Sequence, residues 1–181
     1  MEISAARLII LAGVIAASVC HDIRAKRIPN RVIIFGALAG LASSVLPGSI
    51  GLAQSLGGLG MGLAMLMPLY ALRAMGAGDV KLMAVAGAFL GIETTFFSAL
   101  FAFAAGGLLA LVYSAYAGAF GQTMRNLKMF IFHSAVRVAG GRLPNAGDMA
   151  LGGERMPYSL AIAGGVGTYL AVRFYTAGVL V

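Results

Sequence analysis

Apolar residues fill most of this chain in long runs, which short polar segments separate. The runs cover residues 3–20, 32–46, 52–72, 80–91, 94–120 and 157–178. Crossing about 30 Å of hydrocarbon takes roughly 20 apolar residues in a helix, and a helix satisfies its own backbone polar groups in lipid. The pattern therefore predicts an all-α fold, a polytopic membrane helical bundle with about six transmembrane helices.

Two segments depart from this pattern. The run at 80–91 has about 12 residues, too few to cross the bilayer, which predicts a half-length helix that starts inside the bundle or is deeply buried. Residues 121–156 are polar and basic, but apolar residues recur there on one helical face. This favours a cytoplasmic loop with a helix in the membrane interface. We expect a single integral-membrane domain over residues 1–181.

Small residues at four-residue spacing indicate close helix packing. Gly58 and Gly62 show this spacing in the third run. A longer ridge of the same kind runs through 94–120, at Ala102, Gly106, Ala110, Ser114 and Gly118. We therefore expect 94–120 to form a tightly packed central helix.

Composition agrees with a membrane protein, and the charges predict its orientation. Apolar residues make up 60% of the chain, charged residues 10%, and the net charge is +7. Eleven of the 13 Lys and Arg fall at one side of the predicted bundle: Arg24, Lys26, Arg27, Arg31, Arg73, Lys81, Arg125, Lys128, Arg137, Arg142 and Arg155. Cytoplasmic loops carry such an excess. We therefore expect both termini on the opposite side of the membrane, where Arg7 would snorkel to the surface. The basic residues are explained by this topology, so we expect no binding of nucleic acid.

Two acids stand out against this background. Asp79 lies in Gly76-Ala77-Gly78-Asp79-Val80-Lys81, and Asp22 follows the first apolar run. An Asp at mid-membrane depth costs roughly 2.5–3.5 kcal/mol, so such residues usually face a protein interior and have a partner. The charge pattern puts both acids at helix ends on the cytoplasmic side, where each can partner the other.

Paired carboxylates can hydrolyse a peptide bond when one is ionised and the other protonated. Close like charges cannot both ionise easily, so proximity itself separates the two roles. Gly76 and Gly78 would let a substrate strand or a helix approach Asp79. The single cysteine, Cys20, excludes a multi-cysteine zinc site, and we expect neither metal nor cofactor.

Structural roles for the same residues remain open. Asp79 could cap a short helix, and Asp22 could balance Arg24 and Lys26. Lys81 would project away from Asp79 on a helix and is better placed to bind a lipid phosphate or another carboxylate. Cys20 and His21 are sequence neighbours that point apart on a helix, so they do not indicate a cysteine protease.

Three motifs together carry a resemblance: Asp22 followed by Arg27-Ile28-Pro29-Asn30, Gly76 to Lys81, and Met156-Pro157-Tyr158. The chain resembles the type IV prepilin peptidases, in the short form of Flp/Tad-type pili. The resemblance implies a membrane-embedded aspartic endopeptidase of the bacterial inner membrane, with Asp22 and Asp79 as the catalytic pair. It would remove the basic leader of a prepilin at the cytoplasmic face, ahead of the pilin's hydrophobic helix.

The resemblance also concerns the residues around the pair and the limits of the activity. Arg27, Pro29, Asn30, Gly76, Gly78 and Lys81 are expected to shape the site or contact the substrate. Longer members of the family also methylate the new terminus and have an additional domain with paired cysteines. This chain has neither, so we expect peptidase activity alone, with the prepilin and membrane lipids as partners.

Two other functions use the same acids. A presenilin-like intramembrane aspartic protease shares Gly-x-Gly-Asp, but its second acid would lie within a mid-chain span. A proton-coupled transporter or a membrane assembly subunit would have acids at mid-span in broken helices. The position of Asp22 beside a basic loop favours the prepilin peptidase.

Overall fold

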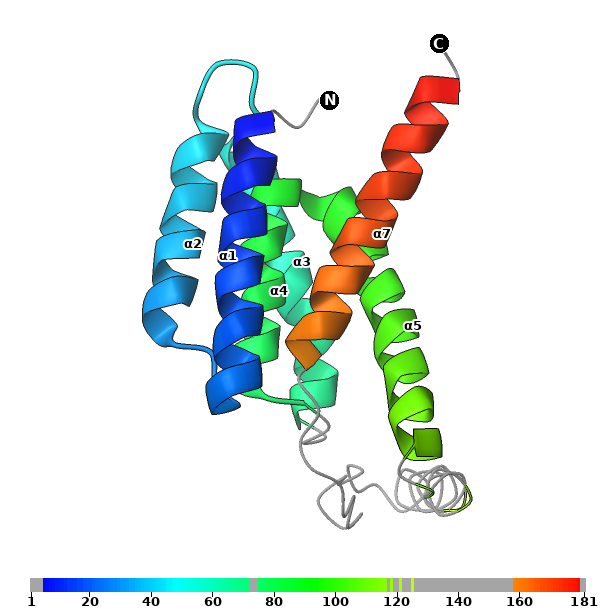
Figure 1. The fold of residues 1–181 in the computed structure, drawn as a ribbon. Helices are drawn as coiled ribbons and strands as arrows, with labels where there is room; N and C mark the ends of the chain where they lie inside the picture. The colour runs from blue at the N-terminus through cyan, green and yellow to red at the C-terminus, as the bar shows by residue number, and fades with distance from the viewer. Residues whose placement is uncertain are drawn as a thin grey trace, which may run out of the picture.

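The described residues of the computed structural model form a bundle of six α-helices with no strand among them (Figure 1). The structure describes residues 5–71, 75–116, 118, 121, 125 and 158–179. The helices are α1 (Ala5–Ala25), α2 (Asn30–Ser44), α3 (Leu52–Ala71), α4 (Ala77–Leu90), α5 (Ile92–Tyr116) and α7 (Tyr158–Val179). The predicted interfacial helix in 121–156 lies outside the described residues, apart from positions 121 and 125.

The all-α membrane fold is confirmed. By length and composition, three of the described helices could each cross a membrane, namely α1, α3 and α5, and α2 is a shorter apolar helix. In Figure 1, α1 to α4 stand side by side, whereas α5 and α7 cross each other beside them. α1 ends, and α4 and α7 begin, towards the lower end of this view.

The centre of the bundle is α4, not the segment 94–120 that the small-residue ridge predicted. From Leu82 to Leu90 every residue of α4 is buried, and the helix contacts α1, α2, α3, α5 and α7. A helix that is apolar on all sides is stable only when neighbours cover it. α5 contacts mainly α7, and its second half leaves Leu108, Leu111 and Tyr116 exposed.

The ridge on α5 has a narrower role than expected. At Gly165 of α7, a Cβ would overlap the backbone of Ala102, so these small residues set the distance between the two helices. Further along the ridge, a Cβ at Gly106 would meet the ring of Tyr158 at 2.6 Å. The ridge therefore joins α5 to α7 and fixes where α7 begins.

α3 and α4 touch through their backbones, as the spacing of Gly58 and Gly62 predicted. A Cβ at Gly58 would overlap the carbonyl oxygen of Gly87, and a Cβ at Gly87 would overlap that of Gly58. A Cβ at Gly62 would lie 2.5 Å from the carbonyl oxygen of Met83. The contact with α3 therefore fixes the position of α4.

Arg7 does not snorkel to the membrane surface as expected. Its side chain is only 2% exposed and turns inward, where Nη2 donates to the carbonyl oxygen of Ala88 at 3.3 Å. Ser55 of α3 donates to the same oxygen at 2.6 Å. The end of α4 far from Asp79 is thus tied to both α1 and α3.

The backbone contact between α3 and α4 predicts a stability difference between glycines of one helix. Gly58→Ala should lower the free energy of unfolding by about 1–3 kcal/mol, because the added methyl group meets backbone that cannot rotate away. Gly60→Ala is the matched control on α3, since nothing lies within 4 Å of its Cβ position. Thermal unfolding in detergent measures both variants, and equal stability of the two would contradict the contact.

Candidate functional site

Asp79 lies in the first turn of α4, where it also caps the helix. Gly76 precedes the helix with extended backbone, and its N–H donates to Oδ2 of Asp79 at 3.2 Å. This is one half of a capping box, and an acid is favourable at a helix N-terminus. The capping role considered for Asp79 is therefore real. The hydrogen bond from Gly76 uses only Oδ2 of Asp79, so capping does not exclude a chemical role for the carboxyl group.

Asp22 lies in the last turn of α1, beyond the apolar run at 3–20. α1 continues to Ala25 because no helix-breaking residue follows the apolar run, and it ends at Lys26, whose φ of 49° is left-handed. Asp22 is half-buried, and Oδ2 of its carboxylate accepts a hydrogen bond of 2.6 Å from Oγ of Ser159. The end of α1 and the start of α7 are joined at this acid.

The two carboxyl groups are close enough for the charge of one to act on the other. Asp79 is 9% exposed and precedes the apolar part of α4, at the edge of the predicted segment 80–91. Burial and, to a lesser extent, the negative charge of Asp22 together raise the pKa of Asp79 from 3.8 to about 6, against the opposing effect of the Gly76 N–H. The structure therefore brings together the two acids that the sequence selected.

The other residues expected at the site lie around the start of α4 and the start of α2. Gly78 faces the side chain of Ile28, which a Cβ would meet at 3.3 Å, and Pro29 is the N-cap of α2. Lys81 is exposed, and its Nζ donates to Oδ1 of Asn30 at 3.2 Å. The start of α2 is thereby tied to α4.

The expected site also includes Arg27 and Gly76, and both are exposed. Arg27 lies in the loop after α1 and Gly76 directly before α4. A strand that approached Asp79 could therefore reach the backbone of Gly76.

Ser159 is a site residue that the sequence did not single out. The motif Met156-Pro157-Tyr158 pointed to this part of the chain, although Met156 and Pro157 lie outside the described residues. The hydroxyl group of Tyr158 donates to the carbonyl oxygen of Ala102 at 3.4 Å. Tyr158 is also close enough to Asp79 for the two side chains to interact electrostatically. Ser159 is a polar residue in the first turn of an otherwise apolar helix, and this is the sequence signal that could have identified it.

Cys20 and His21 form no catalytic arrangement. Both are exposed, and Nδ1 of His21 bonds to the carbonyl oxygen of Ala17 in its own helix at 2.9 Å. Within the described part of the chain, no three His, Cys, Asp or Glu side chains are placed to hold a metal ion. The candidate site is thus a pair of carboxyl groups supported by Ser159 and the Gly76 N–H.

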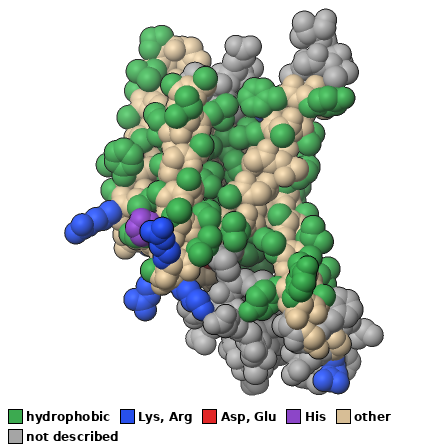
Figure 2. Space-filling view, in the orientation of Figure 1, with side chains coloured by type: hydrophobic (Ala, Val, Ile, Leu, Met, Phe, Trp, Pro, Cys, Tyr) green, Lys and Arg blue, Asp and Glu red, His purple; other side chains and the backbone are tan. Residues whose placement is uncertain are grey.

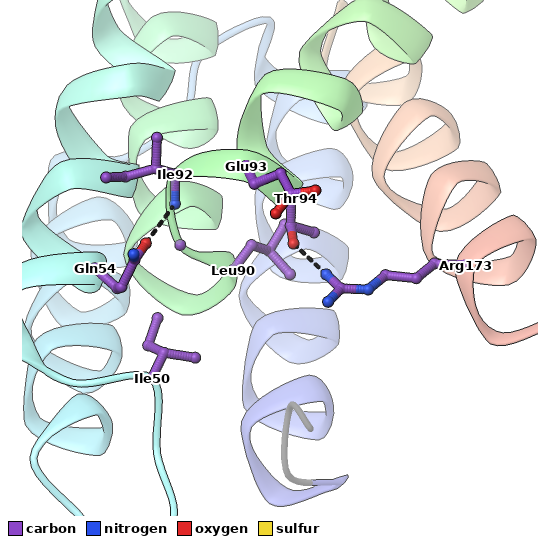
Figure 3. Close-up of a pocket in the computed structure, with 8 residues that line it drawn as sticks. Ile50, Gln54, Leu90, Ile92, Glu93, Thr94 and Arg173 are labelled. Atoms are coloured by element: carbon purple, nitrogen blue, oxygen red, sulfur yellow. Dashed lines mark hydrogen bonds between the residues drawn. The ribbon is translucent and has the colours of Figure 1, made fainter. Parts of the chain in front are cut away.

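A cavity of about 300 Å³ lies at the other end of the bundle, where α4 meets α5 (Figure 3). Arg173 donates to Oγ1 of Thr94 across it, and Gln54 accepts the backbone N–H of Ile92 at 3.4 Å. Gly91 makes the turn between the two helices with φ at 80°. These two hydrogen bonds lie at the end of α4 that is remote from the aspartates.

Comparisons with known proteins address the segment that carries both acids. The model of the type IV leader peptidase family matches residues 8–111, more than half of the chain. The match runs from α1 into α5 and includes Asp22 and Asp79, whereas α7 lies beyond it. Searches of curated proteins and of solved structures found no match.

The raised pKa of Asp79 predicts how stability changes with pH. The folded protein holds this proton more tightly than the unfolded chain, so the contribution is present below pH 3.8 and is lost as pH rises through about 6. Asp79→Asn cannot ionise and escapes this loss. Its stability relative to the wild type should rise by about 2–3 kcal/mol between acidic and neutral pH.

Thermal unfolding in detergent across this pH range measures the effect. Glu93→Gln is the control, because Glu93 is exposed and lies at the opposite end of α4. Glu93→Gln keeps Asp79, so the loss of stability as pH rises through about 6 should persist in it. Parallel curves for the wild type and Asp79→Asn would show that Asp79 has an ordinary carboxyl pKa.

Proposed function

The chain belongs to the type IV leader peptidase family, and from this premise we propose that it is an aspartic endopeptidase which removes the leader of prepilin-like proteins. One observation carries the proposal: the charge of Asp22 acts on the buried carboxyl group of Asp79. The two acids belong to different helices, α1 and α4, and the family match includes both. Paired carboxyl groups fit peptide hydrolysis without a covalent intermediate.

The reaction uses one proton on the pair. The ionised carboxylate takes a proton from water as the water oxygen attacks the scissile carbonyl carbon, and the protonated carboxyl group donates to the carbonyl oxygen. The tetrahedral intermediate collapses when the C–N bond breaks. The first carboxyl group then protonates the leaving nitrogen, and the second recovers its proton from a hydroxyl of the intermediate. Both acids return to their starting states.

The distribution of charge supports a site at the cytoplasmic face. In Figure 2, Lys and Arg gather at the lower end, and hydrophobic side chains cover most of the face above them. Arg24, Lys26, Arg27 and Arg31 lie between Asp22 and the body of α2. Under the positive-inside rule this end faces the cytoplasm, and both chain termini lie on the periplasmic side of the bacterial inner membrane.

The proposed substrate is an Flp-type prepilin, with a basic leader, a glycine and a hydrophobic helix. A site at the end of the bundle suits a cleavage point at the start of such a helix, because the helix stays in lipid while the leader stays in water. Asp22 and Asp79 lie in the terminal turns of their helices. This position supports a leader peptidase over a presenilin-like protease or a proton-coupled transporter, which need acids at mid-span.

The pair can be tested by removing each acid in turn. Asp22→Asn and Asp79→Asn should each reduce cleavage of a co-expressed Flp-type prepilin by at least about 100-fold, because each removes one proton-transfer step. The shift in precursor size on a gel measures cleavage. Glu93→Gln keeps both acids and should cleave as the wild type does. Full cleavage by either Asn variant would refute the proposal.

The product should have an unmethylated N-terminus. The chain has one cysteine, Cys20, and lacks the paired cysteines of the methylating members. Mass spectrometry of the mature pilin, produced with this peptidase as its only processing enzyme, measures the terminus directly. A methylated terminus would show that the activity extends beyond hydrolysis.

A further inference from the structure

Ser159 makes a short contact to the site from a helix outside the family match. It has no exposed surface, and its hydroxyl donates to Oδ2 of Asp22 at 2.6 Å. α7 is held in place by its contact with α5, through Gly165 against Ala102 and through the Tyr158 hydroxyl. The serine therefore has a fixed position, and it contacts one acid of the pair.

Asp22 lies where a negative charge is otherwise unfavourable. The last turn of α1 is the negative end of the helix dipole. A hydroxyl that donates to a carboxylate favours its ionised form. The bond from Ser159 therefore offsets the position of Asp22 at a helix C-terminus.

Asp79 has the opposite environment. It is more deeply buried than Asp22, and its carboxyl group accepts from the Gly76 N–H, at the longer distance of 3.2 Å. Burial and, to a lesser extent, the charge of Asp22 raise its pKa to about 6, so Asp79 holds its proton more tightly than an ordinary carboxyl group does. The two acids of the pair thus differ in burial and in the hydrogen bond that each accepts.

α1 contacts α2, α4 and α7, and each of these elements has ionisable groups towards the end at which Asp22 lies. They are His21, Arg24, Lys26 and Arg27 on α1 and its loop, Arg31 on α2, Asp79 and Lys81 on α4, and Tyr158 on α7. His21 bonds to Ala17, and Lys81 bonds to Asn30. Tyr158 bonds to Ala102, so Ser159 is the described α7 residue that donates to Asp22.

We propose that Ser159 is a positioning residue that keeps Asp22 ionised, so that Asp22 is the base which activates water and Asp79 is the acid which protonates the carbonyl oxygen. This assignment rests on the proposed function. It adds α7 to a site whose two acids come from α1 and α4, and it gives each acid one role. Ser159 acts through Asp22 and takes no part in proton transfer.

The pH profile of kcat/KM separates this role from a purely structural one. The acidic limb reports protonation of the base, and the basic limb reports ionisation of the acid. In Ser159→Ala, the acidic limb should move to higher pH by about one unit, because a hydrogen bond to a charged group is lost. The basic limb should stay in place, and the rate at the optimum should fall several-fold.

The experiment uses purified full-length protein in detergent. The substrate is a precursor with a basic leader, a glycine and a hydrophobic helix. Two further variants complete it. Ser159→Cys retains a weaker donor of similar size and should shift the acidic limb less than Ser159→Ala does. It also tests the proposal if Ser159→Ala fails to fold. Ser44→Ala is the matched control, since this buried hydroxyl donates to Leu41 within α2 at 2.7 Å. Its profile should be that of the wild type.

The outcomes distinguish this inference from the proposed function. An equal loss of rate at every pH in the Ser159 variants would mean that the serine only supports the fold. A shift of the basic limb alone would reverse the roles of Asp22 and Asp79. Either result overturns the inference while the wild type still cuts the precursor. Failure of the wild type to cut it would instead refute the proposed function.

Discussion

The repulsion between two carboxyl groups in a poorly solvated place is the interaction on which the site depends. Asp79 is buried at the start of α4, and the negative charge of Asp22 makes its ionisation still harder. Two ionised acids at such a place are unfavourable, so the pair favours a state with one proton. A shared proton is what peptide hydrolysis by carboxyl groups requires. The fold therefore has to hold two helix ends together against this repulsion.

Most of the bundle serves to fix those ends. α4 is enclosed by its neighbours, and its contact with α3 leaves no space for a side chain between Gly58 and Gly87. At its far end, Arg7 and Ser55 both donate to Ala88. Because a packed helix moves as a rigid unit, these remote contacts set the position of Asp79. In the same way, the close approach of α5 and α7 fixes the position of Ser159.

The sequence predicted the helices, the glycine contact and the two acids because each has a local signal. The apolar run at 3–20 ends before α1 does, because an apolar run marks where lipid ends and a helix can continue past that point. The segment of α4 was predicted to be a half-length or deeply buried helix, but the ridge on α5 suggested that α5 was the central helix. Small residues indicate that a helix packs closely, but they do not show which helix it packs against. Ser159 is separated from Asp22 by most of the chain, so only the fold reveals their hydrogen bond.

The most direct test of this account is the titration of Asp79 itself, followed by NMR of labelled aspartate carboxyl carbons in detergent. Signals are assigned with Asp79→Asn, and the wild type is compared with Asp22→Asn. Asp79 should titrate near pH 6 in the wild type. In Asp22→Asn its midpoint should fall, yet stay above 3.8, because burial is the larger cause of the shift and remains. A wild-type midpoint near 3.8, or one that does not respond to Asp22→Asn, would contradict the existence of a coupled pair.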